Sequence, residues 1–172
     1  MKTFEEFLLE KRISQLSINT VKKIISRDEL AQLIQEGITD FSEYDYSKVT
    51  NMSGLCFNGN ISETPLLDTE NVLDMSAMFF GCKNLTTINH LDTSSVTDMD
   101  TMFLGCTELK RIPKMDTDNV VSMKGIFDGC DSLEYIERPS DWYRYDWNSS
   151  GAPKNPILRD KYPELYDKPL RK

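Results

Sequence analysis

Apolar residues recur along this chain with a period of 24 residues. Three units, starting at Leu67, Leu91 and Met115, read LDTENVLDMSAMFFGCKNLTTI, LDTSSVTDMDTMFLGCTELKRI and MDTDNVVSMKGIFDGCDSLEYI. A fourth, degenerate copy, YDYSKVTNMSGLCF, precedes them. A fixed period of this length predicts a solenoid, because each unit can bury its apolar face only against its neighbours.

Within one unit, the apolar positions predict a short helix followed by a short strand. Between Ser94 and Cys106 they fall on the stripe of a helix with one buried face, at Val96, Met99, Met102, Phe103 and Cys106. The Asp-Thr-Ser start supplies oxygens for a helix cap, and Gly105 marks the end of the helix. The Leu-x-x-Ile segment at 109–112 predicts a strand that pairs in parallel with its copies. We therefore expect an α/β solenoid of about four repeats.

The valine and methionine at fixed places in each unit are expected to form the core. These residues are Val72, Val96 and Val120 with Met75, Met99 and Met123. A methionine stripe can also mark an adaptable binding groove. Core filling is favoured here, because a second methionine position, that of Met78 and Met102, carries Leu55 and Ile126 in the other units.

The chain outside the repeats divides into three parts. Residues 26–45 predict an N-terminal cap, with a Ser26/Glu29 capping box, a helix that ends at Gly37, and a first strand over 38–41. Residues 1–25 predict a separate helix with a Thr3/Glu6 capping box and a connector; this helix either docks on the core or acts as an addressing segment. After the repeats of 46–136, residues 137–172 predict an aromatic C-terminal cap and a proline-rich tail.

Charge and hydropathy exclude several classes of protein. The formal net charge is −8, and the sequence pI is about 4.7, whereas nucleic-acid binders need cations that neutralise phosphates. Apolar runs are only a few residues long, so no membrane span is predicted. The N-terminal MKTFEEFLLEKR lacks the pattern of a signal peptide. We expect a cytoplasmic monomer.

Repeated cysteines and aspartates each allow a structural and a chemical interpretation. Cys82, Cys106 and Cys130 occupy one place per unit, which favours buried free thiols over a zinc site or disulfides. An aspartate lies four residues before the repeated valine of each unit, at Asp45, Asp68, Asp92 and Asp116. This row could bind calcium, or each aspartate could bond local backbone N–H groups. The local role is favoured, because calcium-binding repeats are shorter and rich in glycine. No metal or cofactor is expected.

No catalytic constellation is present in the sequence. The single histidine, His90, lies in a predicted turn, and no nucleophile is placed beside a base. We therefore expect a protein that is not an enzyme.

The candidate contact residues are those that vary between units on the constant frame. They lie between the leucine and the isoleucine of each predicted strand: Thr86, Thr87, Lys110, Arg111, Glu134 and Tyr135. Variable side chains on a fixed scaffold are where specificity is usually encoded. Trp142 and Trp147 form an aromatic cluster that is either a lid over the last unit or a second contact patch. These residues predict a non-enzymatic protein–protein interaction module whose partner is another protein.

The repeat phrase resembles the BspA-like leucine-rich repeats of bacterial surface proteins. The resemblance rests on LDTSSVTDMDTMFLGC and its in-phase copies, and covers roughly residues 26–136. It implies a leucine-rich-repeat-like, right-handed solenoid used for adhesion or other protein contacts, with no known catalysis. The missing export signal departs from that family and puts a surface location in doubt.

The N-terminal MKTFEEFLLE is similar to capsid-targeting segments on internal proteins of large contractile-tailed phages. Those segments are trimmed after a Leu-x-Glu-type site, and Leu8-Leu9-Glu10 fits that pattern. An ordinary amphipathic helix gives a similar string. The alternative function is therefore that of a phage virion or capsid-packaged protein acting on a host protein, located in the virion.

Overall fold

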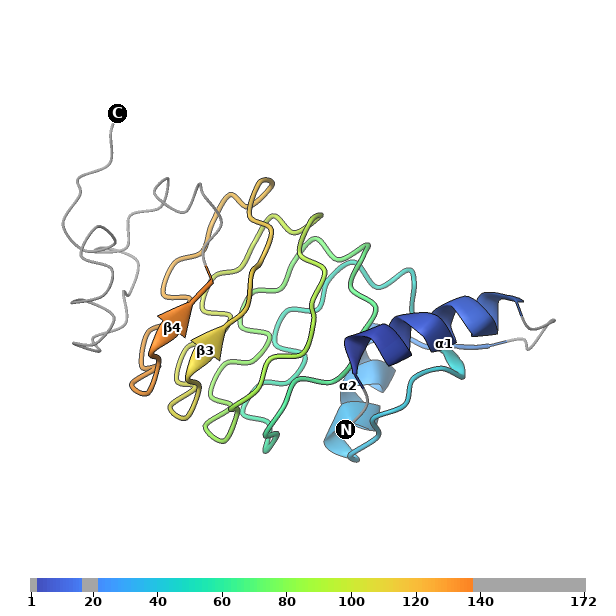
Figure 1. Ribbon diagram of the computed structural model, residues 1–172, viewed down its shortest axis with the longest axis horizontal. Coiled ribbons are helices and arrows are strands. Elements are labelled where there is room, and N and C mark those ends of the chain that lie inside the picture. The colour runs from blue at the N-terminus through green and yellow to red at the C-terminus, as the bar shows by residue number, and fades with distance from the viewer. Residues whose placement is uncertain (1–2, 17–21, 138–172) are drawn as a thin grey trace.

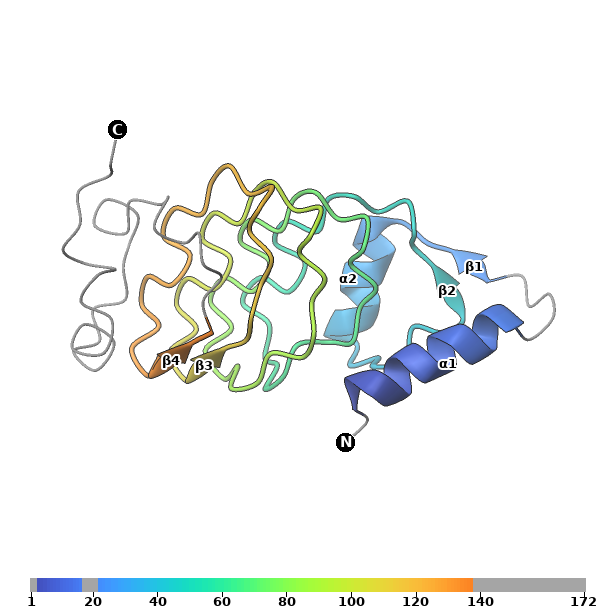
Figure 2. The ribbon, with the colours of Figure 1, turned by 45° about the horizontal axis from the view of Figure 1, so that its top comes forward.

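The computed structural model describes residues 3–16 and 22–137. Its regular elements are α1 (Phe4–Leu16), β1 (Lys23–Ile24), α2 (Arg27–Gln35), β2 (Tyr44–Asp45), β3 (Arg111–Ile112) and β4 (Tyr135–Ile136). Most of the chain between β2 and β4 forms loops of similar shape that lie side by side (Figures 1 and 2). The two helices stand at one end of this stack, and β3 and β4 lie toward the other end.

Backbone hydrogen bonds join each repeat to the next in a fixed pattern. In the repeat of Val72, the N–H groups of every second residue donate to carbonyls of the following repeat, over 2.7–2.9 Å. These pairs are Met75 to Asp98, Ala77 to Asp100, Phe79 to Met102, and Gly81 to Leu104. The repeats of Val49 and Val96 donate to their successors from the same four positions. The N–H groups between them close turns within their own repeat, for example Met78 to Met75 and Cys82 to Phe79.

The helix expected between Ser94 and Cys106 is absent, and a run of turns takes its place. Met99, Thr101, Phe103 and Gly105 donate their N–H groups to the next repeat, so these groups cannot close the i to i−4 bonds of an α-helix. Successive turns, each closed by an N–H to carbonyl bond from residue i to residue i−3, place side chains inward at nearly the same spacing as a helix does. The apolar pattern therefore did not distinguish the two structures.

Two residues in each repeat adopt positive φ, which makes the run of turns possible. The first position is occupied by Gly54, Ala77, Thr101 and Gly125, with φ between 51° and 62°. The second, four residues later, is occupied by Asn58, Gly81, Gly105 and Gly129, with φ between 52° and 75°. A positive φ at the third residue is characteristic of type II turns, in which glycine and asparagine are favoured.

The core is a set of columns in which one residue type stacks on its copies. Val72, Val96 and Val120 are buried, as are Met75, Met99 and Met123, which confirms both predictions for these residues. Phe79, Phe103 and Phe127 form a second column, with near-parallel rings whose centroids lie 5.6 Å and 6.0 Å apart. Identical offsets in the sequence thus become vertical contacts between repeats.

Polar side chains complete the connections between repeats. The repeated aspartates accept from local backbone N–H groups, as predicted; Asp92, for example, accepts from Ser94 N over 2.9 Å. Two buried threonines that directly follow these aspartates bridge to the next repeat: Thr69 Oγ1 donates to the carbonyl of Asp92 and accepts from its N–H, and Thr93 Oγ1 donates to the carbonyl of Asp116. The sequence analysis did not identify this threonine row.

The N-terminal cap begins and ends its helix largely as predicted, but its strand is elsewhere. Ser26 and Glu29 form the capping box of α2, and Gly37, at φ 82°, follows its last turn. The first strand was expected over 38–41; the structure places β2 at Tyr44–Asp45, where it pairs in parallel with β1. Residues 41–44 form a turn, closed by the hydrogen bond from Tyr44 N to the carbonyl of Phe41, so the strand begins only at Tyr44.

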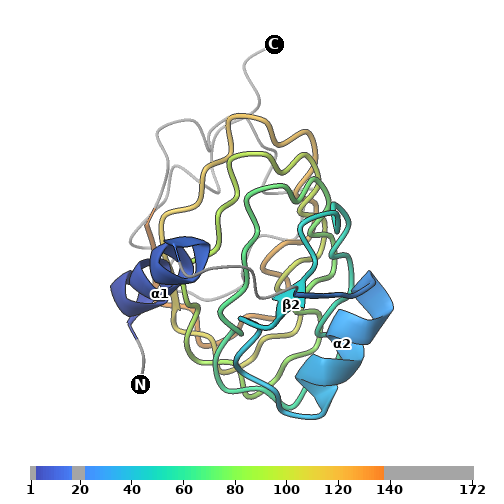
Figure 3. The same ribbon diagram turned by 90° about the vertical axis from the view of Figure 1, so that its right-hand side faces the viewer.

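Helix α1 lies on one side of the N-terminal end of the stack and α2 on the other (Figure 3). The predicted capping box is present, because Thr3 N donates to Glu6 Oε2 and Glu6 N donates to Thr3 Oγ1. The ring of Phe4 stacks on His90 at 3.9 Å, and Lys11 Nζ lies 2.5 Å from Asp68 Oδ2. The sequence left open whether this helix docks on the core or acts as an addressing segment; in the structure it packs against the repeats.

We predict that Met99→Ala lowers the free energy of unfolding by about 2–5 kcal/mol, because it truncates a fully buried side chain in the middle of a column. Urea denaturation followed by circular dichroism would measure the change. Val121→Ala is the control: this side chain is 82% exposed, so the variant should stay within about 0.5 kcal/mol of the wild type. Equal losses in the two variants would contradict the stacked core.

Candidate functional site

The candidate contact residues from the repeats share one exposed face, which we call the strand face. It comprises Thr86, Thr87, Lys110, Arg111, Glu134 and Tyr135. All are exposed except Tyr135, which is half-buried. The leucine and isoleucine that flank each pair are buried or half-buried, so the variable side chains are those that remain outside.

Parallel pairing fixes the backbone beneath this face. Arg111 in β3 pairs with Tyr135 in β4, and the carbonyl of Lys110 accepts from the N–H groups of Glu134 and Tyr135 over 2.9 Å and 3.2 Å. In the preceding repeats, Thr87 pairs with Glu63. The guanidinium of Arg111 lies over the ring of Tyr135, with Cζ 4.9 Å from its centroid, in a cation–π arrangement.

The strand face therefore presents two cations, a carboxylate, an aromatic ring and two hydroxyls from adjacent repeats. Thr86 also donates through Oγ1 to the carbonyl of Ser62 over 3.0 Å, which holds its hydroxyl against the preceding repeat. Trp142 and Trp147, the other candidate contact residues, lie outside the described residues.

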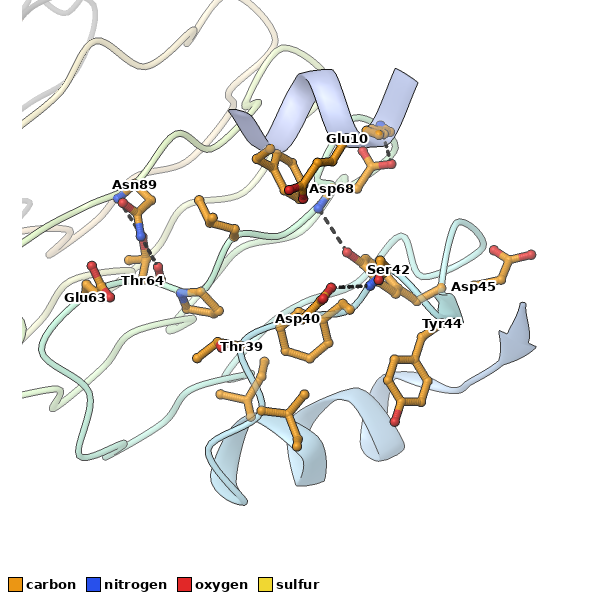
Figure 4. Close-up of a pocket in the computed structure, with 18 of the residues that line it drawn as sticks. Glu10, Thr39, Asp40, Ser42, Tyr44, Asp45, Glu63, Thr64, Asp68 and Asn89 are labelled. Atoms are coloured by element: carbon orange, nitrogen blue, oxygen red, sulfur yellow. Dashed lines mark hydrogen bonds and ion pairs between the residues drawn. The ribbon is translucent and has the colours of Figure 1, made fainter. Parts of the chain in front are cut away.

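A pocket of about 600 Å³ lies at the N-terminal end of the molecule, between α1, the end of α2 and the first repeat (Figure 4). Its apolar wall includes Phe7 from α1, Ile34 from α2, Phe41, and Ile61 and Leu66 from the first repeat. The close-up shows Glu10 and Asp68 on the side of α1, Thr39 and Asp40 across from them, and Glu63 at one end beside Thr64 and Asn89.

Hydrogen bonds hold several polar groups of the pocket wall in place. Tyr46 accepts through its hydroxyl from the N–H of Asp68 over 3.1 Å, and burial raises the pKa of Tyr46 to about 12. Asp40 accepts through Oδ1 from Ser42 N over 2.9 Å. Thr64 Oγ1 accepts from Asn89 N over 2.7 Å. Glu63 differs, because its Oε2 is buried and has no hydrogen-bond partner within the described part of the chain.

The sequence analysis did not identify this pocket. Its walls come from segments that are far apart in the chain and that meet only when α1 docks. The available signal was the apolar face of the first helix, where Phe4 and Phe7 lie one turn apart, but that face alone does not say which surface it covers.

All four cysteines are buried free thiols, and three of them, Cys82, Cys106 and Cys130, occupy the same position in successive repeats and form a column. Each donates through Sγ to a backbone carbonyl of the preceding repeat: Cys82 to Cys56, Cys106 to Phe79 and Cys130 to Phe103, over 3.0–3.1 Å. Burial raises the thiol pKa to about 11 for Cys82 and to about 12 for Cys130. Among the described residues, no three side chains of histidine, cysteine, aspartate or glutamate are placed to hold a metal ion.

Two further observations concern membrane-spanning helices and the single histidine. Neither helix within residues 3–16 and 22–137 combines the length and apolar character required to cross a membrane. His90, the only histidine of the chain, is exposed and stacks on Phe4, so its visible contact is structural.

Comparison with known proteins gives a match to one protein family and none to an individual curated protein or solved structure. Residues 26–142 match the model of a family described as "Mycoplasma protein of unknown function, DUF285", and the chain belongs to this family. No curated protein and no solved structure matches the chain. The match spans the cap and all four repeats but leaves out α1.

We predict that the four cysteines react slowly with a thiol reagent at pH 8, because burial and raised pKa values leave almost no accessible thiolate. Labelling by iodoacetamide, followed by mass spectrometry, would measure the rate. The same protein in guanidinium chloride is the control and should label at all four sites. Rapid labelling of the native chain would contradict the burial of the thiols.

We also predict that stability decreases as the pH rises above about 9. In the unfolded chain the thiols ionise near their ordinary pKa of 9.0, whereas Cys56 and Cys130 stay protonated in the folded protein up to a pKa of about 12. The unfolded state then binds fewer protons, so the free energy of unfolding falls with pH between these values and is unaffected by the thiols below them. The urea concentration at the midpoint of unfolding, measured at pH 8 and at pH 10.5, would test this. The Cys82→Ala variant lacks one of the buried thiols, so its midpoint should decrease less between the two pH values than that of the wild type.

Proposed function

We propose that this member of the DUF285 family is a non-enzymatic protein–protein interaction module, built as a leucine-rich-repeat-like solenoid. The support is the arrangement of the repeats: buried columns of like residues, hydrogen bonds from each repeat to the next, and short parallel strands. The likeness of the repeat phrase to BspA-like repeats, which function in adhesion and other protein contacts, agrees with this proposal.

The single observation that carries the proposal is the strand face. Its backbone is pinned by parallel hydrogen bonds and its variable side chains are exposed. A partner that binds a pre-ordered surface loses less conformational entropy than one that must order a loop. Arginine and tyrosine are enriched at protein interfaces, and Arg111 and Tyr135 already lie against each other.

The chemistry of the chain also favours a protein partner over nucleic acid. The net charge is −8, and the two cations of the strand face, Lys110 and Arg111, share it with the carboxylate of Glu134. A nucleic-acid surface needs several cations in a row to displace counterions from phosphates. A mixed surface of this kind suits a partner with a matching mixture of charges and apolar groups.

We predict that a Lys110→Ala, Arg111→Ala, Tyr135→Ala triple variant keeps its melting temperature but loses its partner. The altered side chains lie outside the core, where substitutions usually change stability by less than about 0.5 kcal/mol each. The measurement is affinity purification from a host lysate, with quantitative mass spectrometry of the proteins retained by wild type and by each variant.

A second triple variant, Lys48→Ala, Asp118→Ala and Lys124→Ala, is the matched control, because it removes three exposed charged side chains away from β3 and β4. It should retain the same partner as the wild type. If the strand-face variant also retains that partner, whereas folded Trp142→Ala or Trp147→Ala does not, the contact surface is the C-terminal aromatic cluster and the proposed face is wrong.

A further inference from the structure

Helix α2 is fixed firmly at the N-terminal end of the stack. Its Leu30 and Ile34 side chains are only 0% and 7% exposed. Arg27, in its first turn, donates through Nη2 to the carbonyl of Ser53 in the first repeat. The strand before it, β1, pairs in parallel with β2. Buried side chains and backbone pairing therefore make α2 an integral part of the cap.

Helix α1 is attached in a different way. Over residues 3–11, where its side chains are described, none is buried; Phe4, Phe7 and Lys11 are half-buried, and the others are exposed. Among the described residues, no backbone hydrogen bond joins α1 to the cap or to the repeats. A helix of 13 residues is only marginally stable in water on its own, so α1 depends on side-chain contacts for its order.

An aromatic contact and an ion pair hold α1 against the repeats. The ring of Phe4 stacks on that of His90, with centroids 3.9 Å apart. Lys11 Nζ lies 2.5 Å from Asp68 Oδ2 and 3.9 Å from Glu70 Oε2. The Lys11 and Asp68 side chains are 29% and 33% exposed, so water and salt weaken this ion pair. These contacts therefore stabilise the docked position of α1 only modestly.

Helix α1 also covers a cavity instead of a close-packed surface. Phe7, one turn after Phe4, lines the pocket of about 600 Å³, whose wall also includes Phe41, Ile61 and Leu66. Figure 4 shows α1 along one side of this space. Side chains that border a cavity lack van der Waals partners on that side, so the docked helix is stabilised less than by close packing. Moving α1 away therefore breaks few contacts and opens the apolar wall to solvent.

We propose that α1 is a displaceable cover of this pocket. In the described state it lies over the apolar wall; in a second state it leaves the wall while α2 and the repeats stay folded. The family match agrees with this division, because it begins at residue 26, the N-cap of α2, and leaves α1 out. The ion pair of Lys11 makes the balance between the two states depend on salt concentration. This device is separate from the strand face and does not depend on the function proposed for that face.

Amide hydrogen exchange of the full chain, followed by NMR, tests the proposal by comparing residues 8–16 of α1 with residues 31–35 of α2. The amide groups of α1 should exchange at least about tenfold faster than those of α2, because α1 opens without the rest of the domain. Sodium chloride at about 0.5 M should speed the exchange of α1 further and leave α2 unchanged, since it screens the ion pair. Equal exchange of the two helices, or exchange of α1 at the rate of an unstructured peptide, would overturn the proposal.

Lys11→Ala removes the ion pair, so it should speed the exchange of α1 at least about twofold and make it insensitive to salt. Lys83→Ala, which removes an exposed lysine, is the matched control and should behave like the wild type. The double variant Phe4→Ala, Lys11→Ala should release α1, so that the backbone N–H signals of Ile61 and Leu66 shift while α2 keeps its protection. Loss of α2 protection in this variant would show that α1 is integral to the fold, and unchanged signals of the wall would show that α1 does not cover it; either result would contradict the proposed cover.

Discussion

The hydrogen bonds from each repeat to the next are the constraint on which the rest of this structure depends. A chain with few helices and very short strands must still satisfy its buried N–H and carbonyl groups, because an unpaired group in the core is costly. Here, alternate N–H groups of the turn segment donate across the repeat boundary, and those between them close local turns. Every repeat is therefore completed only by its neighbour.

This pattern explains why the side chains fall into columns. Because the register between repeats is the same at every boundary, Phe103 lies between Phe79 and Phe127, and the cysteine thiols reach carbonyls of the preceding repeat. A truncation in one column removes contacts with two other repeats. Residues on the strand face have no such role, so they can differ between repeats without disturbing the frame.

The N-terminal end follows different rules, and the pocket is a consequence. The first repeat has no preceding repeat, and it meets α1, α2 and the α2–β2 connection instead. These elements have different shapes, so they do not interdigitate as the repeats do. The ion pair of Lys11 with Asp68 and the ring contact of Phe4 with His90 hold α1 in place beside a space that its side chains do not fill.

The sequence by itself determined which residues are buried and how the units are spaced. The 24-residue period placed the valine, methionine and cysteine columns, and the capping boxes of Thr3/Glu6 and Ser26/Glu29 marked the starts of both helices. These features are local or strictly periodic, so they can be read along the chain. The variable residues of the strand face were found in the same way, by comparing one unit with the next.

Only the tertiary structure decided the conformation within each repeat and the location of the pocket. Inward positions spaced three or four residues apart fit both a helix and a run of turns. The two structures differ in which carbonyl groups accept from the N–H groups of Met99 and Phe103. Here the acceptors belong to the next repeat, and no local sequence pattern specifies them. The pocket likewise requires Phe7, Ile34 and Glu63 to line one cavity, and these residues are too far apart in the sequence for any local pattern to indicate it.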